Sequence, residues 1–400
     1  MNLKSLRPNF LSADSIVAGA GIWGCTLARR LAEAGRKVLV LEKRSAVGGN
    51  CRCEIDPETG IEIHTYGSHI FHTHNRQVWD FVRRFTDFNG YQHKVLANYK
   101  GKVYHLPLGL TLINKFFNVE LRPGEVEEFL GERRAGDSAP YRGADQGTNR
   151  DALFEAFFRG YTSKQWEMAP EEIDPSIIKR VPVRNNYDTN YFNDYWQGIP
   201  ADGYNRLFDN MLDHPNIAVQ CNAEFQVSGF RFQVNGEELP TVPVYYSGPI
   251  DALFGYKFGA LPWRSLRFER ETLNCRDFQG TTVMNYTEAE VPYTRIHEFR
   301  HYHPESNGGV HPTIEQSNNL NNRTIIMREY PSAWKLGDEP YYPINNSESA
   351  ALLAKYQEEV KKFNHRSTPT TSTSLVVGGR LGGYKYYDMD QAMAAALELR

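Results

Sequence analysis

The sequence predicts an α/β protein in which a discontinuous, Rossmann-like nucleotide-binding domain is joined to a helical domain and an antiparallel β-sheet domain. Three observations predict this fold class. A glycine-rich turn near the N-terminus connects a short apolar strand to a helix, as in a βαβ nucleotide-binding unit. Segments of this α/β kind occur at both ends of the chain, whereas the middle shows alternating or helical periodicity. The length of 400 residues exceeds what one compact core usually holds, so more than one domain is expected.

The N-terminal segment has the pattern of one βαβ unit. Residues 15–18 are a short apolar strand, residues 25–34 follow a helical pattern closed by Gly35, and residues 37–41 are a second buried strand. A further helix is expected over residues 78–85. Two parallel strands joined by a helix therefore begin the predicted nucleotide-binding domain.

The middle of the chain has a different pattern. Residues 90–107 alternate apolar and polar side chains, which is typical of an antiparallel hairpin, and residues 110–179 are rich in helical periodicity. Residues 281–286 and 324–329 are expected to be strands of an antiparallel sheet. Residues 301–322 are polar and rich in asparagine, so we expect an exposed insertion there.

The C-terminal segment returns to the α/β pattern. A core strand is expected over residues 242–247, an amphipathic helix over 350–363, a last buried strand over 375–379 and a terminal helix over 390–399. The predicted domains are a nucleotide-binding domain over residues 1–88, 200–255 and 343–400, a helical domain with a mobile substrate loop over 108–180, and an antiparallel sheet domain over 89–107, 181–199 and 256–342.

Composition excludes several classes of protein. A formal net charge of -3 argues against a general nucleic-acid binder, which would need an excess of Lys and Arg. Five cysteines in 400 residues do not form a disulfide framework, and the odd count fits a reducing compartment. No apolar run approaches the roughly 20 residues that a membrane-spanning helix needs. The sequence therefore predicts a soluble, cytoplasmic protein with no membrane span.

The glycine turn has the spacing of a dinucleotide-binding site. Gly19 makes the tight turn, Gly21 lets the backbone approach a pyrophosphate, and Gly24 lets the helix pack on the strand. The helix N-terminus supplies amides and a partial positive charge to the phosphates. Glu42, at the end of the next strand, can accept the ribose hydroxyls. Such a turn alone is weak evidence, but the strand, the helix and the acidic residue are all present here.

The segments after the turn favour FAD over NAD. Glu42-Lys43-Arg44 leads into a second glycine step, Gly48-Gly49-Asn50, and Gly378-Gly379-Arg380 lies near the C-terminus. This layout resembles that of two-domain flavoproteins, in which FAD lies across the strand ends and a C-terminal segment contacts the flavin.

Several long motifs extend this likeness to one family. They are Gly67-Ser68-His69-Ile70-Phe71-His72-Thr73, Tyr161-Thr162-Ser163-Lys164-Gln165-Trp166 running on to Ile178-Lys179-Arg180-Val181-Pro182, residues 190–200, residues 379–390, Asn285-Tyr286-Thr287-Glu288, Tyr293-Thr294-Arg295, and residues 339–343. Together they resemble UDP-galactopyranose mutase of the bacterial type, from about Ile16 to Gln391. The chain departs from the family pattern at Ser68, where the family often has another small residue or proline, and after His303, where the asparagine-rich stretch is longer than usual.

The resemblance implies an isomerase that interconverts UDP-galactopyranose and UDP-galactofuranose with no net redox change. In the family reaction, N5 of reduced flavin attacks the anomeric carbon and UDP leaves, so a covalent intermediate divides one difficult step into easier ones. It also implies that FAD is active when reduced, by an external reductant such as NAD(P)H, and that the enzyme is a homodimer acting in cell-wall polysaccharide biosynthesis. The implied cofactor contacts are Gly19, Gly21, Gly24, Glu42, Lys43, Arg44, Gly49, Asn50, His69, Arg380 and Met389.

Two arginines are the candidates for binding the diphosphate. A leaving pyrophosphate gains negative charge and needs positive groups placed in advance, and the planar fork of Arg matches phosphate oxygens. Arg180 and Arg295 are these candidates; either alone would more often be a surface or ion-pair residue, but their motif context favours the site. Arg180 lies in a Lys-Arg-Val-Pro segment that we expect to form a mobile lid.

Aromatic and polar residues complete the predicted substrate site. The tyrosines expected to donate hydrogen bonds to phosphate are Tyr191, Tyr342 and Tyr386. Tyr161 and Trp166 can stack on uracil while Asn285 reads a polar edge, although a Trp in such a run is more often core. Asp388 either belongs to the polar network of the site or is a solvated carboxylate.

Two histidines and one further arginine are the residues that the resemblance places near the flavin. His72 would tune N5 or relay a proton, with His69 nearby, and Arg380 would favour the reduced anion. His64 and His74 lie close in sequence, but no carboxylate or cysteine completes a ligand set, so no metal is expected.

Two other classes of function remain open at this point. A flavin oxidoreductase of the amine-oxidase type shares the nucleotide turn, but it would bury an apolar or amine substrate and would not place two arginines against an anion. A nucleotide-dependent binding module with an idle flavin is a non-enzymatic alternative. Arg180 together with Arg295 favours the mutase over both.

Overall fold

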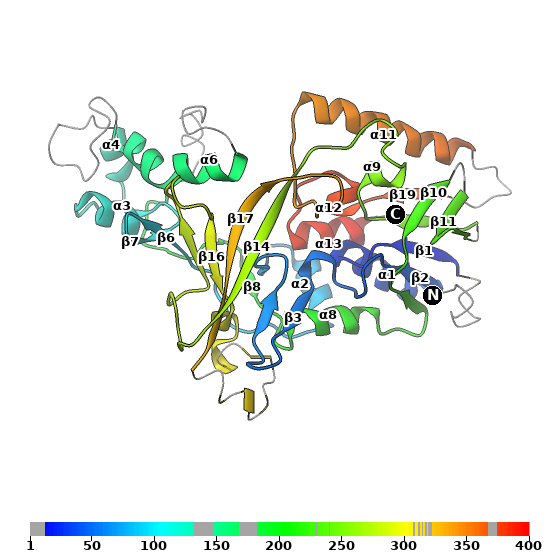
Figure 1. The fold of residues 1–400 in the computed structure, drawn as a ribbon, viewed down its shortest axis with the longest axis horizontal. Helices are drawn as coiled ribbons and strands as arrows, with labels where there is room; N and C mark the ends of the chain where they lie inside the picture. Colours follow the sequence, from blue (N-terminus) through cyan, green and yellow to red (C-terminus); the bar gives the residue numbers. More distant parts are fainter. Residues whose placement is uncertain are drawn as a thin grey trace.

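The molecule is elongated, with the nucleotide-binding part at one end and a helical arm at the other (Figure 1). The computed structural model describes residues 13–131, 148–167, 182–228, 231–239, 241–306, 309–310, 313, 315–316, 318, 322–366 and 374–399. Two long strands, β14 and β17, run between the two ends (Figure 1). Within the described part of the chain, no helix is both long enough and apolar enough to cross a membrane.

A five-stranded parallel sheet forms the nucleotide-binding part. In spatial order its strands are β19 (Leu375–Val377), β13 (Val244–Tyr246), β1 (Ser15–Ala18), β2 (Val38–Leu41) and β9 (Ile217–Gln220). These strands come from three separate stretches of the chain, as expected for a discontinuous domain. The sheet is buried on both faces, which is why its strands are near-continuous apolar runs.

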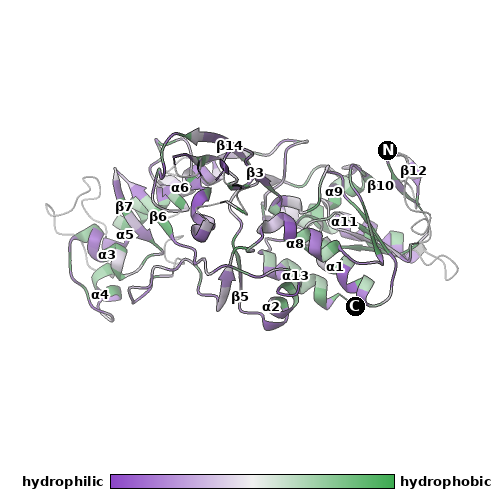
Figure 2. Ribbon diagram, turned by 90° about the horizontal axis from the view of Figure 1, so that it is seen from below, coloured by the Kyte–Doolittle hydropathy of each residue, from purple (hydrophilic) through white to green (hydrophobic). Residues whose placement is uncertain are grey.

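Alternate side chains of these strands support two separate cores. Val17 and Val40 face one core with helices α1 (Ile22–Glu33), α8 (Gly203–Leu212) and α13 (Met389–Glu398). Ile16 and Leu39 face the other core, where Phe363 packs with the aromatic side chains of a small sheet. The elements on this second face are α9 (Ile250–Leu253), α11 (Ser347–Arg366), β10 (Phe225–Ser228), β11 (Arg231–Val234) and β12 (Glu237–Glu238). Figure 2 shows hydrophobic and hydrophilic residues side by side on α1 and α8, as a helix with one buried face requires.

A seven-stranded sheet forms the middle of the molecule. Its spatial order is β18 (Tyr342–Pro343), β14 (Trp263–Leu273), β17 (Thr324–Ala333), β16 (Arg295–Glu298), β15 (Val283–Tyr286), β6 (Val95–Tyr99) and β7 (Lys102–Leu106). The pairings are antiparallel except for β6 with β15, which run parallel. The sheet therefore brings the hairpin β6–β7, from early in the chain, beside strands that follow almost 200 residues later.

The helical arm packs on one end of this sheet. Its elements are α3 (Leu110–Phe117), α4 (Val126–Gly131), α5 (Asn149–Phe154), a π-helical turn (Glu155–Arg159) and α6 (Gly160–Trp166). Tyr104 of β7 belongs to the same buried cluster as Phe116 and Phe157 of the arm. Lys164 anchors α6 to the sheet, because its ammonium donates to the carbonyl oxygens of Tyr286 at 2.6 Å and Tyr293 at 2.9 Å.

Short elements lie between the two sheets. They are the 3₁₀ turns at Gly49–Cys51, Phe299–Tyr302 and Pro304–Ser306, the ribbons β3 (Cys53–Ile55) with β4 (Glu62–His64) and β5 (Phe71–Thr73) with β8 (Trp196–Gly198), and the helices α2 (Arg76–Val82) and α12 (Gly379–Gly382). These segments include parts of three of the motifs that the sequence singled out, in residues 67–73, 190–200 and 379–390.

The predicted fold class is confirmed, including the Rossmann-like sheet, the helices of the arm and the largely antiparallel sheet. The predicted exposed insertion is wrong at its beginning, since Tyr302 and His303 are 0% and 1% exposed. Tyr302 stacks on His64, and the imidazole of His303 contacts the buried Glu62, so both are held by aromatic and ionic contacts. The strand β14 was not predicted at all. The exact domain boundaries stay a prediction.

Candidate functional site

The glycine turn after β1 has no room for larger residues. Gly19 has φ +107°, and a Cβ there would lie 2.2 Å from Oγ of Ser247. A Cβ on Gly24 would lie 1.9 Å from the carbonyl oxygen of Gly19, so the third glycine lets α1 pack against the turn. Gly49, with φ +56°, lies against the turn, because a Cβ added there would be 2.9 Å from Cα of Gly21. The two glycine steps therefore form one backbone cradle, as a bound pyrophosphate requires.

Glu42 is fixed at the carboxyl ends of β1 and β2. One carboxylate oxygen accepts the backbone N–H of Ala20 at 2.8 Å, and the other accepts that of Arg44 at 2.9 Å. The side chain is only 5% exposed. Each oxygen keeps a further lone pair for a ribose hydroxyl, so the geometry agrees with the role that its position in the sequence predicts.

A cavity of about 530 Å³ opens above this turn. Ten of the eleven predicted cofactor contacts line this cavity: Gly19, Gly21, Glu42, Lys43, Arg44, Gly49, Asn50, His69, Arg380 and Met389. The predicted substrate residue Asp388 also lines it. Gly24 lies outside the lining because it packs helix against strand. The lining also includes Cys51, Ser247 and residues 337–340, which were not among the predicted cofactor contacts; Ser247 and residues 337–340 are distant in sequence from the glycine turn.

The lining fits a dinucleotide of the FAD type. The volume lies in the usual range for small-molecule sites, and the cradle and Glu42 match a pyrophosphate and a ribose. Among the described residues, Nη1 of Arg44 is a buried donor without a hydrogen-bond partner, so one cationic N–H remains for an anionic ligand. Its guanidinium is otherwise paired with Glu339 at 2.6 Å.

His69 and Arg380 lie at the end of this cavity. Burial, with a smaller effect of the nearby Arg380 charge, lowers the pKa of His69 to about 4, so its imidazole is neutral at pH 7. Its Nδ1–H donates to the carbonyl oxygen of Gly67 at 2.6 Å, which leaves Nε2 as an acceptor. Arg380 donates from Nε to the carbonyl of Tyr387 at 2.9 Å. No described carboxylate forms an ion pair with Arg380, so it keeps an uncompensated positive charge at the cavity.

Arg295 is the centre of a second group of residues, on the seven-stranded sheet. It lies on β16 opposite Asn285 of β15, donates from Nη2 to the hydroxyl of Tyr161, and holds Glu329 with its Nε 3.3 Å from Oε1. Burial alone would lower the pKa of Arg295, but Glu329 and then Tyr161 and Tyr342 more than offset this, so the pKa is raised. A permanently charged guanidinium is therefore surrounded by tyrosines. Together they offer a positive charge and hydroxyl donors to an anionic ligand.

A pair of stacked tyrosines connects the two groups. The rings of Tyr342 and Tyr386 are 5.5 Å apart and nearly parallel, and the guanidinium of Arg380 lies 5.3 Å from the ring of Tyr386. Arg295 also interacts electrostatically with both tyrosines, because its positive charge acts to lower the pKa of each hydroxyl. In the described part of the chain, Oδ1 of Asn285 is buried and has no hydrogen-bond partner. The structure thus brings together Arg295, Asn285, Tyr161, Tyr342, Tyr386 and Arg380.

Other predicted residues lie at the margin. His72 does not line the cavity; its Nδ1 is 2.8 Å from Asp194, and its ring stacks on Phe192 with 3.7 Å between centroids. Tyr191 makes an edge contact with His93, while its charge interaction with Arg295 places it near the second group. Trp166 is 41% exposed and lies beside the guanidinium of Arg264, at 5.6 Å. Arg180 lies outside the described residues.

Glu329 and His297 are site residues that sequence reasoning missed. Glu329 pairs with both Arg295 and His297 and is 6% exposed. Burial alone would raise its pKa, yet Arg295 and His297 lower it to about 2, so the carboxylate is ionised at neutral pH. The only signal for Glu329 in the sequence was an acidic residue after the apolar run Ile325-Ile326-Met327.

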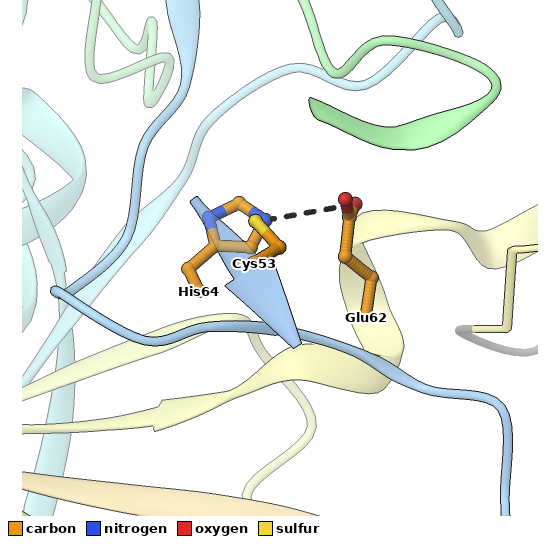
Figure 3. Close-up of side chains that lie close together, drawn as sticks. All are labelled: Cys53, Glu62 and His64. Carbon is orange, nitrogen blue, oxygen red and sulfur yellow. Dashed lines mark ion pairs between the residues drawn. The ribbon is translucent and has the colours of Figure 1, made fainter. Parts of the chain in front are cut away.

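A buried cluster of Cys53, Glu62 and His64 has the residue types of a metal site (Figure 3). Nδ1 of His64, however, accepts the backbone N–H of His69 at 3.0 Å. Burial lowers the pKa of His64 well below its usual value, so the neutral ring carries its proton on Nε2. This is the nitrogen that faces Glu62 at 3.9 Å. A protonated Nε2 cannot bind a metal, so the cluster is better described as a hydrogen-bonded support of the His69 segment.

Comparisons with known proteins agree with this geometry. The family model for UDP-galactopyranose mutase matches residues 156–386, and a model for an NAD(P)-binding Rossmann-like domain matches residues 17–85. The solved structure of a reduced UDP-galactopyranose mutase superposes with a TM-score of 0.67 at 16% identity, covering 97% of this chain and 94% of that one. At this identity the superposition shows that the fold is shared.

Two curated relatives are similar over almost their whole length. A probable UDP-galactopyranose mutase from Klebsiella pneumoniae is 39% identical, over 96% of this chain and 92% of the relative. A dTDP-fucopyranose mutase from Escherichia coli is 37% identical, over 96% of both chains. The family model and these relatives, together with the shared fold, show that this chain belongs to the UDP-galactopyranose mutase family.

Proposed function

We propose that this protein interconverts UDP-galactopyranose and UDP-galactofuranose with FAD in its reduced state, without net redox change. The observation that carries the proposal is the placement of Arg295. This partly buried cation lies among tyrosines and is linked through the Tyr342–Tyr386 stack to Arg380 at the dinucleotide cavity. A sugar nucleotide with its diphosphate at Arg295 would therefore present its sugar toward the cavity.

The residues of the chain would act mainly by positioning and by charge. Reduced FAD, when bound, supplies the nucleophile for the anomeric carbon, and UDP is the leaving group. Arg295 stabilises the charge that develops on the diphosphate, and the hydroxyls of Tyr342 and Tyr386 add hydrogen bonds. Arg380 favours an anionic ring next to it, since described carboxylates do not pair with its charge. Arg180 belongs to the proposal as a second diphosphate ligand on a closing segment.

The remaining predicted residues have supporting parts in this proposal. Tyr161, besides holding Arg295, would stack on uracil together with Trp166, and Asn285 offers an unpaired acceptor for a polar edge of the base. His69, neutral with Nε2 unprotonated, is a hydrogen-bond acceptor at the cavity. His72 does not line the cavity, so we propose a weaker effect for it.

The direct test is incubation of dithionite-reduced protein with UDP-galactofuranose, followed by chromatography of the products. We expect UDP-galactopyranose to appear with reduced protein and far more slowly with oxidised protein. A complete lack of conversion by reduced protein that still carries flavin would end the proposal.

A second candidate is the corresponding reaction of dTDP-fucose. It is favoured by the relative that is named dTDP-fucopyranose mutase, whose identity to this chain is only slightly lower. The same assay with dTDP-fucofuranose decides between them by the ratio of kcat/KM. An oxidoreductase of the amine-oxidase type is disfavoured, because amino-acid oxidases are distant relatives and Arg295 would repel a cationic amine.

The proposal extends to an external reductant such as NAD(P)H and to a homodimer. Anaerobic addition of NADPH should bleach the flavin absorbance, and light scattering should give twice the mass of the 45.8 kDa chain. No bleaching would contradict NADPH as the reductant, and a monomeric mass would contradict the homodimer. Neither result would contradict the isomerase proposal.

A further inference from the structure

A chain of hydrogen bonds, completed by one ion pair between Glu329 and Arg295, joins Arg295 to the segment that faces the dinucleotide cavity. We propose that His297 is a positioning residue of this site, and that with Ser68 and Glu329 it holds residues 67–69 in register with Arg295. The inference rests on the proposed function for its catalytic consequence. The path itself can be tested in the free protein.

The contacts of the path are buried or partly buried. Oγ of Ser68 lies 2.5 Å from Nδ1 of His297, and Nε2 of His297 lies 3.0 Å from Oε2 of Glu329. The other oxygen of Glu329 lies 3.3 Å from Nε of Arg295. Tyr302, which is fully buried, donates its hydroxyl to Oγ of Ser68. Side chains from β16, β17 and the loop after β4 thus form one connected group.

The direction of every proton in the path follows from Glu329. An ionised carboxylate only accepts hydrogen bonds, so Nε2 of His297 must carry the proton of a neutral ring. Its Nδ1 is then an acceptor, and Ser68 must donate to it. Because the Ser68 hydroxyl donates in this way, its oxygen is free to accept from Tyr302. Burial keeps the pKa of His297 low, which agrees with a neutral ring.

The path acts on the segment that carries His69. A Cβ on Gly67 would lie 3.4 Å from the ring of Phe268 and 3.8 Å from Oε2 of Glu329, so the backbone of this segment lies close to both side chains. Ser68 is held by His297 and Tyr302, and His69 is held by its contacts with Gly67 and His64. One carboxylate therefore orients both the diphosphate-binding arginine and, through His297, the segment at the flavin side of the cavity.

The same path makes the hydroxyl of Ser68 a requirement in this chain. A proline or another small residue without a hydroxyl at this position would leave Nδ1 of His297 without a donor and the hydroxyl of Tyr302 without an acceptor. In this chain the serine and the histidine are complementary, although they are 229 residues apart.

The first measurement is ¹⁵N NMR of the histidines in the flavin-bound protein without substrate. We expect His297, identified by its loss in His297→Gln, to be neutral at pH 7 with the proton on Nε2. A proton on Nδ1, or a charged ring, would overturn the inference whatever the fate of the mutase activity.

The second measurement compares Ser68→Ala and His297→Gln with Thr86→Ala, a buried hydroxyl outside the path. Loss of a buried hydrogen-bond partner should lower kcat about tenfold in both path variants, with KM changed less than about twofold. The flavin absorption spectrum should shift in both path variants and stay unchanged in Thr86→Ala. If Ser68→Ala is folded and has the wild-type kcat and spectrum, the inference is wrong.

Discussion

At the scale of single residues, the charge of Arg295 depends on two opposing effects on its pKa. Burial opposes the charged form, while the carboxylate of Glu329 and the surrounding tyrosines favour it. Removing the arginine leaves the buried Glu329 without its cationic partner, with only hydrogen bonds such as that from His297, which is costly. A variant at this position therefore tests both ligand binding and the stability of the group, and the two effects have to be separated.

Arg295→Ala is expected to lower kcat/KM about 100-fold or more while the flavin stays bound, because one preorganised donor to the developing charge is lost. Arg295→Lys keeps a charge near Glu329 but loses the planar fork, so it should fold normally and remain impaired. The control is Arg267→Ala, an exposed arginine of β14. Wild-type turnover in Arg295→Lys and Arg295→Ala would remove this residue from the site.

Arg180→Ala should also lose most turnover, and His72→Ala should lose less, with flavin retained in both.

Buried neutral histidines predict how stability depends on pH. Burial lowers the pKa of His69 to about 4 and that of His93 to about 3, both below the value near 6.5 of an unfolded chain. Below pH 6.5 the unfolded state therefore binds protons that the native state does not. The free energy of unfolding is therefore highest above pH 6.5. It falls as the pH is lowered toward 4, by about 2 kcal/mol per histidine at pH 5.

Urea unfolding at pH 7.5 and pH 5.0 measures this loss. The variant His93→Gln should lose less stability between the two pH values than the wild type. An equal loss in the two proteins would mean that His93 is not a buried neutral group in the native state.

At the scale of elements, the docking of α6 on the sheet determines where Tyr161 lies. Gly160 starts this helix, and a Cβ there would lie 2.4 Å from the carbonyl oxygen of Thr287 and 2.7 Å from the amide of Ala289. The π-helical turn just before it changes the direction of side chains, as such turns often do near functional sites. The contact is therefore set by backbone, and a methyl group cannot be accommodated without moving the helix.

Gly160→Ala should weaken UDP binding and lower activity, since it moves Tyr161 away from Arg295, while FAD binding is unaffected. The matched control is Gly131→Ala in helix α4, where a Cβ meets nothing within 4 Å. Titration calorimetry with UDP measures the effect. Equal UDP affinity in the two variants would show that the position of α6 does not matter for the site.

The sequence predicted those elements whose pattern is local. The strand, glycine turn, helix and acidic residue around Gly19 follow one another within 30 residues, and the structure has them where they were expected. Strand β14 was missed because four of its eleven side chains are charged and exposed, so its strand character comes from pairing with β17. Arg295 was found through a motif, whereas Glu329 and His297 matter only through contacts that no short pattern encodes.

At the scale of the whole molecule, the cofactor cavity draws its walls from distant parts of the chain. Residues near 19, 42, 223–227, 246–256 and 379–392 all line it. A ligand in this cavity binds the folded state only, so it should stabilise the protein by mass action.

FAD-depleted protein is therefore expected to melt at least about 5 °C below protein reconstituted with excess FAD, as measured by differential scanning fluorimetry. Protein with Glu42→Ala, which lacks the ribose acceptor, should gain less from added FAD. An identical melting temperature with and without FAD would place the dinucleotide elsewhere.

The order of strands in the parallel sheet has a consequence for how the enzyme matures. The edge strand β19 and the following segment, with Gly379, Arg380 and Met389, leave the ribosome more than 350 residues after the glycine turn. The complete cavity therefore cannot form before these residues have been synthesised. A nascent chain that stalls before residue 375 contains the residues of the cradle but lacks part of the wall of the cavity.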